Sequence, residues 1–165
     1  MIVVEDGSGK THSNAYCDAF FADDYFAARW NARWAGLEEE EEKEAALIRA
    51  TDYIEGRFGG AFIGIRSTNE QALSWPRRNT AFTGIPERLK NACCEYAVRA
   101  LDGPLAKDPV LDQAGYRLAA TMQKVGPLQI AATVAGNGQP CDMGVYPEAD
   151  MWLSGLLTSL NRTYR

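Results

Sequence analysis

The first residues of this chain that could do chemistry are the glycine-rich run GSGKT, from Gly7 to Thr11. Glycine-rich loops ending in lysine can bind phosphate groups through successive backbone N–H groups. In that pattern two glycines stand five positions apart, and the second one precedes the lysine. Gly9 precedes Lys10 here, but the residue five positions before Gly9 is Val4 and not glycine. The run is too short to wrap a phosphate, so we interpret it as a surface turn.

Catalytic side chains form no pattern either. His12 is the only histidine, and nothing near it completes a nucleophilic triad. Carboxylates are plentiful, but no spacing singles out a pair for acid–base chemistry; the candidates considered are Asp23, Asp24, Asp52 and Glu55. We therefore expect neither an enzyme nor a cofactor.

The cysteines also lack the spacing of a metal site. Cys17, Cys93, Cys94 and Cys141 include no CxxC or Cys/His pair, whereas zinc sites require such pairs. Buried free thiols are the expected state, and no bound metal is predicted.

The Trp-Pro-Arg-Arg run from Trp75 to Arg78 has two interpretations. An aromatic ring beside basic residues could stack a base and bind phosphates. Alternatively, Trp75 is a buried anchor, and Pro76 fixes the direction in which the chain leaves it. We favour the anchor, because one aromatic and two arginines make a small nucleic-acid footprint.

Bulk properties narrow the function classes. The chain has 165 residues, a net charge of −5 and a pI of about 4.9. Proteins that grip nucleic-acid backbones use clustered lysine and arginine, so this balance argues against that role. We expect one domain, synthesis in the cytosol, no secretory signal and no bilayer-spanning run.

Periodicity predicts a mainly α fold: a small bundle of about four helices with an inserted β-hairpin and a C-terminal amphipathic helix. Asp18 is a plausible N-cap for the first helix. Five glutamates, Glu38–Glu42, occupy the first turns of the long helix, where they compensate the helix dipole. The predicted elements are helices over 19–30, 39–57 and 86–101, strands over 116–124 and 128–134, and a final helix from 146 onward.

The final helix follows a glycine-rich tether over 136–144 and carries Trp152 beside a leucine stripe. It is either a fourth core helix or an amphipathic anchor for a partner's groove, with Trp152 as the expected hot spot. The sequence leaves both open.

Several motifs together resemble a tailed-phage family. They are EDGSG, NAY, EAALIRATDYIEGRF, LSWPR, IPERLKNA, QKVGPLQI and YPEADMWL, and they cover nearly the whole chain in order. The family is labelled a DnaT-like single-stranded DNA-binding protein. The chain is also similar to the head-tail connector adaptors of long-tailed phages.

The adaptor resemblance implies a virion structural protein of the neck, present in the host cytoplasm during assembly. Such adaptors form a ring of copies of themselves, usually twelve, below the portal protein; they extend the DNA channel, touch DNA at most transiently, and present a surface to the next neck or tail-completion protein. The DnaT-like label implies instead a replication accessory that binds single strands.

By that analogy the chain divides into an adaptor domain over 1–135 and a tether with a docking helix over 136–165. The resemblance implies that the C-terminal segment engages the portal. The hairpin packs either on the helices or on a neighbouring copy, and it is our candidate for contact with a neighbouring copy or the next ring. The portal-contact candidates are Tyr146, Trp152, Leu153, Leu156, Leu157 and Leu160. The candidates for the ring or neck contact are Lys124, Val125, Gly126, Pro127 and Leu128.

Overall fold

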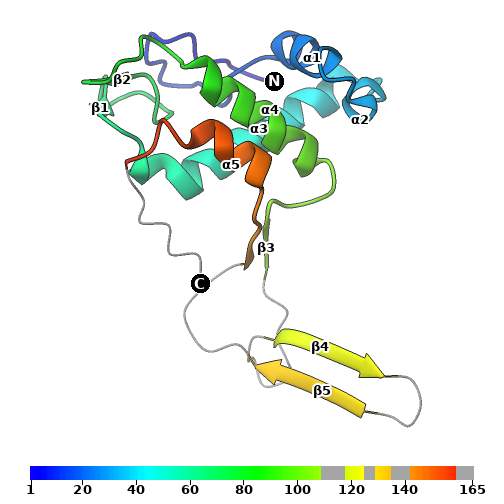
Figure 1. Ribbon diagram of the computed structural model, residues 1–165. Coiled ribbons are helices and arrows are strands. Elements are labelled where there is room, and N and C mark those ends of the chain that lie inside the picture. The colour runs from blue at the N-terminus through cyan, green and yellow to red at the C-terminus, as the bar shows by residue number, and fades with distance from the viewer. Residues whose placement is uncertain (109–117, 125–128, 135–141, 159–165) are drawn as a thin grey trace. The chain divides into compact units, whose positions relative to one another are not determined.

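The computed structural model describes residues 1–108, 118–124, 129–134 and 142–158. The chain divides into two compact units: unit 1 contains Met1–Leu105 and Tyr146–Arg165, and unit 2 contains Ala106–Val145 (Figure 1). This division differs from the expected one at residue 135, because the last helix packs against the helices of unit 1. Unit 2 is therefore an insertion between the last two helices.

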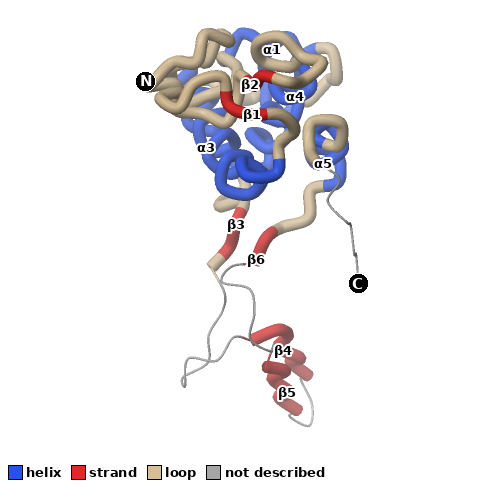
Figure 2. Tube along the Cα trace, turned by 90° about the vertical axis from the view of Figure 1, so that its left-hand side faces the viewer, coloured by secondary structure: helices blue, strands red, loops and turns tan. Residues whose placement is uncertain are grey.

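Unit 1 is helical, as predicted (Figure 2). Its helices are α1 (Ala19–Ala27), α2 (Ala32–Ala35), α3 (Glu40–Phe58), α4 (Glu87–Ala100) and α5 (Pro147–Leu153), with a short 3-10 turn, η1 (Gly59–Ala61). The helices α3 and α4 pack together, and α5 packs on α4. None of the helices in the described part of the chain is both long and apolar enough to cross a membrane.

The long helix α3 follows from its sequence. Leu47, Ala50 and Ile54 recur at three- and four-residue steps and are fully buried, which gives the helix one apolar face. Glutamates fill its first turn and Arg57 lies in its last, so both ends complement the helix dipole. The opposing face comes from α4, where Leu89, Cys93, Tyr96 and Ala100 are buried.

The capping residues in the sequence predicted the first residues of α1 and α4 to within one position. The Asp18 side chain accepts a hydrogen bond from the Phe21 backbone N–H at 2.8 Å, which confirms the predicted N-cap of α1. Pro86, expected inside the first turn of α4, occupies the N-cap position itself, and the helix begins at Glu87.

The strands among the described residues form three separate antiparallel pairs. Unit 1 contains β1 (Ile65–Arg66) paired with β2 (Arg77–Arg78). Unit 2 contains β3 (Ala106–Lys107) paired with β6 (Asp142–Met143), and β4 (Leu118–Lys124) paired with β5 (Gln129–Val134). The β4–β5 pair is the predicted hairpin. The candidate contact residues Val125, Gly126, Pro127 and Leu128 lie outside the described residues, as does the side chain of Lys124.

The C-terminal helix is shorter than predicted. It ends at Leu153, so Leu153, Leu156 and Leu157 do not share one helical face. After Gly155 the chain joins the segment that follows η1: the Ile63 N–H donates to the Leu156 carbonyl at 2.9 Å, and the Thr158 N–H donates to the Ala61 carbonyl at 2.8 Å. This long-range pairing replaces the last predicted turns, and Leu160 lies outside the described residues.

Candidate interaction surfaces

The backbone N–H groups of the glycine-rich loop donate hydrogen bonds to the side chain of Glu5, a residue of the same loop. Glu5 is 1% exposed, and its Oε1 accepts the N–H groups of Gly7 and Gly9, both at 2.9 Å. Its Oε2 accepts the Lys10 N–H at 2.8 Å and the Ser13 hydroxyl at 2.9 Å. These donors are consumed inside the protein, so the loop is a structural turn.

The other candidate chemical groups are dispersed or structurally engaged. His12 is exposed. The Asp23 carboxylate accepts from Lys43 and from the Trp34 indole, and Glu55 binds the Tyr16 hydroxyl and Ser74. Within the ranges that the structure describes, no cluster of three histidine, cysteine or acidic side chains could hold a metal ion.

Three of the four cysteines lie in the described part of the chain, and all three are buried free thiols. The Sγ atoms of Cys17 and Cys94 are 3.9 Å apart. A hydrogen bond with Cys17, together with burial, raises the pKa of Cys93 well above its ordinary value. Cys93 therefore stays protonated and contacts Thr51 and Leu47 of α3. Cys17 and Cys94 belong to the packing between the N-terminal segment and α4.

The Trp-Pro-Arg turn is an anchor. Trp75 is fully buried and meets Phe62 and Phe82 edge to face, with ring centroids 6.0 and 6.1 Å away. The Arg77 guanidinium donates to the carbonyls of Ile63 and Gly64 at 2.8 and 2.9 Å. Since both groups serve the fold, neither is presented to a nucleic acid.

The helix α5 is held in the core by apolar and polar contacts. Leu153 and Leu156 are fully buried. Tyr96 donates to the Asp150 carboxylate, which also pairs with Arg57 at 3.8 Å. Burial, and then this hydrogen bond, raise the pKa of Tyr96 far above its usual value.

Tyr146, just before α5, packs at the same place. Its ring meets those of Tyr53 and Tyr96 with centroids 5.9 and 5.7 Å away, and its hydroxyl donates to the Leu105 carbonyl at 2.9 Å. Of the proposed portal-contact residues, Tyr146, Leu153 and Leu156 thus hold the segment to its own protein. Trp152 and Leu157 are half-buried and remain accessible.

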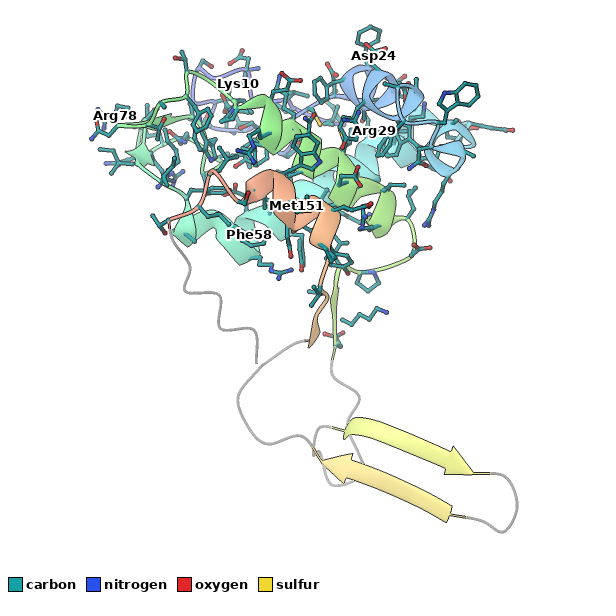
Figure 3. The ribbon with its side chains drawn as sticks, in the orientation of Figure 1. Lys10, Asp24, Arg29, Phe58, Arg78 and Met151 are labelled. Atoms are coloured by element: carbon teal, nitrogen blue, oxygen red, sulfur yellow. The ribbon has the colours of Figure 1, made fainter. Side chains whose placement is uncertain are left out.

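Trp152 lines a pocket of about 390 Å³ between α1, α4 and α5. Arg29 lies over the Tyr25 ring there, 3.6 Å from its centroid, and Arg88 is the second basic side chain. Met151 is exposed at the rim (Figure 3). Two glutamates, Glu95 and Glu148, complete the lining, so the pocket carries both charges.

A second accessible aromatic surface, at the turn between α1 and α2, was missed from the sequence. Trp30, in this turn, is 94% exposed, and Phe20, in the first turn of α1, is 75% exposed. Beside Trp30 lies a pocket of about 250 Å³, lined mainly by Phe26 and the alanines of the two helices. The sequence predicted a helix over 19–30 that includes Trp30, whereas α1 ends at Ala27, so the predicted helical periodicity does not apply to this residue.

The fold and these surfaces define a class: a small helical unit with an inserted β-ribbon unit, in which the glycine-rich loop and the Trp-Pro-Arg turn are structural. A sequence model of the family described as "Putative DnaT-like ssDNA binding protein" matches residues 1–165, and the chain belongs to that family. The description names single-stranded DNA binding and not a head-tail connector. Neither a curated protein nor a solved structure matches the chain.

Proposed function

We propose that this protein is a structural adaptor of a tailed-phage neck, which assembles by protein–protein contacts between the portal and the next neck component. The observation that carries the proposal is the accessible aromatic surface of unit 1. Trp30 and Phe20 are exposed in the α1–α2 region, and Trp152, on α5, is half-buried. Exposed aromatic side chains are typical of protein interfaces.

The use of the charged groups supports this role. Lys43, Arg57 and Arg99 pair with acidic side chains of the same protein, and Arg77 is taken up by backbone carbonyls. The whole chain has a net charge of −5. An acidic wall lets DNA slide past, whereas tight binding of a strand needs clustered cations.

Unit 2 fits an adaptor as well. It contains a two-stranded ribbon, β4–β5, and such a ribbon is only marginally stable by itself. Contact with a neighbouring protein would stabilise it. We propose the 124–128 region of this hairpin as a contact with a neighbouring copy or the next ring, and Trp152 with Leu157 as the accessible part of the portal contact.

The second candidate is binding of single-stranded DNA in replication, and the family match favours it. The pocket of Trp152, Arg29 and Arg88 is where such binding would be sought, since it joins an aromatic ring to two guanidinium groups. Glu95 and Glu148 line the same pocket and would repel phosphates. The charge of the pocket argues against this candidate, and the family match argues for it.

Mass spectrometry of purified virions tests the adaptor directly. We expect the protein in mature particles at an abundance near that of the portal protein, and a shared complex when the two are mixed. A Trp152→Ala variant should weaken that complex, while His12→Ala, an exposed change elsewhere on unit 1, should leave it intact. Absence from virions would refute the proposal.

A titration with single-stranded oligonucleotide separates the two candidates. An adaptor shows no tight binding that weakens steeply with salt, whereas a strand-binding protein does. If binding is seen, an Arg29→Ala and Arg88→Ala double variant should abolish it, with Arg49→Ala, an exposed arginine on α3, as the matched control.

A further inference from the structure

We propose that copies of this protein associate head to tail, the α1–α2 end of one copy meeting the β1–β2 end of the next. The inference rests on the proposed function, whose ring requires self-contact, and it names the two surfaces that make that contact. We call them the aromatic end and the basic end.

The aromatic end combines exposed rings with negative charge. Trp30 and Phe20 are its exposed rings, and Asp24 and the glutamates of 38–42 are exposed around the α1–α2 region and the start of α3. Residues 18–42 carry eight acidic and two basic side chains. Both basic groups are engaged internally: one lies over the Tyr25 ring and the other pairs with Asp102.

The turn that carries Trp30 holds this ring out of the core. Trp30 has a φ of +52°, a left-handed conformation that residues other than glycine seldom adopt. Four residues later, Trp34 is 1% exposed and donates its indole N–H to Asp23 at 2.7 Å. The local fold thus buries one tryptophan and presents the other, beside an apolar pocket.

The basic end is complementary in charge. Ile65 is 51% exposed and lies opposite Arg78 in the β1–β2 pair. Arg66, its neighbour, and Arg78 are both exposed. Residues 65–80 carry three basic side chains and one acidic side chain. Arg77 is bound to backbone carbonyls and Arg66 also donates to the Gln71 carbonyl, so the exposed charges are those of Arg66 and Arg78. An aliphatic side chain flanked by guanidinium groups suits an indole ring surrounded by carboxylates.

The two ends lie at opposite ends of α3. The chain enters α3 from α2 and leaves it through η1 into β1, and a helix of 19 residues is about 28 Å long. Figure 1 shows α1 and the β1–β2 pair apart, and in Figure 3 Asp24 and Arg78 lie at opposite sides of unit 1. Contact between unlike surfaces is heterologous, which builds rings or filaments.

A contact between two aromatic ends would bring the acidic residues of both copies together. The glutamates of 38–42 would then face like charges, which costs free energy in an interface that excludes water. Opposite ends avoid this repulsion. A second copy presenting its basic end is therefore the occupant that the charge pattern selects.

Sedimentation velocity of the full chain over a range of concentrations tests the contact. We expect the mass to rise with concentration at about 50 mM salt and less at about 500 mM, since salt screens the paired ends. Trp30→Ala, and separately Arg66→Glu with Arg78→Glu, should each weaken association about tenfold or more, as hot-spot losses do. Met151→Ala, exposed on α5, is the matched control and should associate like the wild type.

The most decisive experiment mixes the Trp30→Ala variant with the variant that carries both Arg66→Glu and Arg78→Glu. Trp30→Ala copies keep an intact basic end, and the arginine-to-glutamate copies keep an intact aromatic end, so one contact forms and assembly stops at a dimer. A mixture that stays monomeric, or a wild type that stays monomeric at low salt, overturns the inference. The virion test reports on the adaptor function independently of this contact. If the protein is found in virions but the mixture or the wild type stays monomeric, the proposed function stands and only this interface is wrong.

Discussion

Two segments that each carry a tryptophan and apolar neighbours, α5 and the α1–α2 turn, differ in what covers them. In α5, Leu153 is buried against the protein's own helices, and Asp150 is 7% exposed and bound to Tyr96 and Arg57. At the α1–α2 turn, Trp30 faces solvent. The sequence left open whether the final segment is a core helix or a docking helix, and it did not single out Trp30.

The difference shows that an apolar stripe predicts burial of a surface. It does not say whether the same protein or a partner covers that surface. The α5 stripe is covered by α4 and by the segment that follows η1, which lies about ninety residues earlier in the chain. The α1–α2 ring has no such cover among the described residues. Partner surfaces are therefore to be sought in what the fold leaves exposed.

The largest expected effect concerns Leu153. Leu153→Ala should lower the free energy of unfolding by about 2–5 kcal/mol, because the side chain is fully buried and its loss leaves a cavity. Urea unfolding followed by circular dichroism measures this. Leu157→Ala, at a half-buried position, should cost clearly less. Equal stability of Leu153→Ala and wild type would mean that α5 is not part of the core.

The sequence was most informative where the signals are local. The Asp18 N-cap, the apolar faces of α3 and α4, and the β4–β5 hairpin follow from nearby residues, and the structure has each of them. These features depend on hydrogen bonds and periodicities that span a few residues. They were predictable for that reason.

Features that depend on distant partners were not predictable. The end of α5 at Leu153 follows from the pairing of 156–158 with 61–63, which no local pattern encodes. Glu5 is one of many acidic residues in the sequence, and its burial within the glycine-rich loop appears only in three dimensions. Trp30 was placed inside the predicted helix over 19–30, and only the structure shows that α1 ends before it, at Ala27.

The second effect tests whether the glycine-rich loop is built around Glu5. Glu5→Gln should lower the free energy of unfolding by about 1–3 kcal/mol, since an amide NH₂ group would face donors that now bond to a carboxylate oxygen. The same urea experiment measures it. Asp6→Asn, on the exposed neighbouring residue, is the control and should change stability by less. A neutral Glu5→Gln would show that the loop does not depend on this carboxylate.

The third effect tests the polar attachment of α5 by pH. An unfolded tyrosine loses its proton near pH 10, whereas the folded state keeps Tyr96 protonated because its pKa is raised. The stability from this group is therefore fully present below about pH 10 and falls as the pH rises further. The decline is about 1.4 kcal/mol per pH unit for one proton.

Urea unfolding at several pH values above 10 measures that slope. Tyr96→Phe removes the titrating hydroxyl, so its stability should fall less steeply than that of the wild type in the same range. Absorbance of tyrosinate near 295 nm should show the tyrosine ionising late in the folded protein. Identical slopes for the two proteins would mean that Tyr96 titrates as a solvent-exposed group.

The smallest expected effect on stability is at the aromatic end. Trp30→Ala should change the free energy of unfolding by less than about 0.5 kcal/mol, because an exposed side chain contributes few core contacts. The variant should lose most of the fluorescence that acrylamide quenches readily, since Trp34 and Trp75 are buried. Trp34→Ala is the contrasting control, with an expected loss of about 3–5 kcal/mol. A large loss of stability for Trp30→Ala would place this ring in the core and remove the reason to expect a partner there. The change in the free energy of unfolding therefore decides whether the α1–α2 turn, unlike α5, is left uncovered by its own protein.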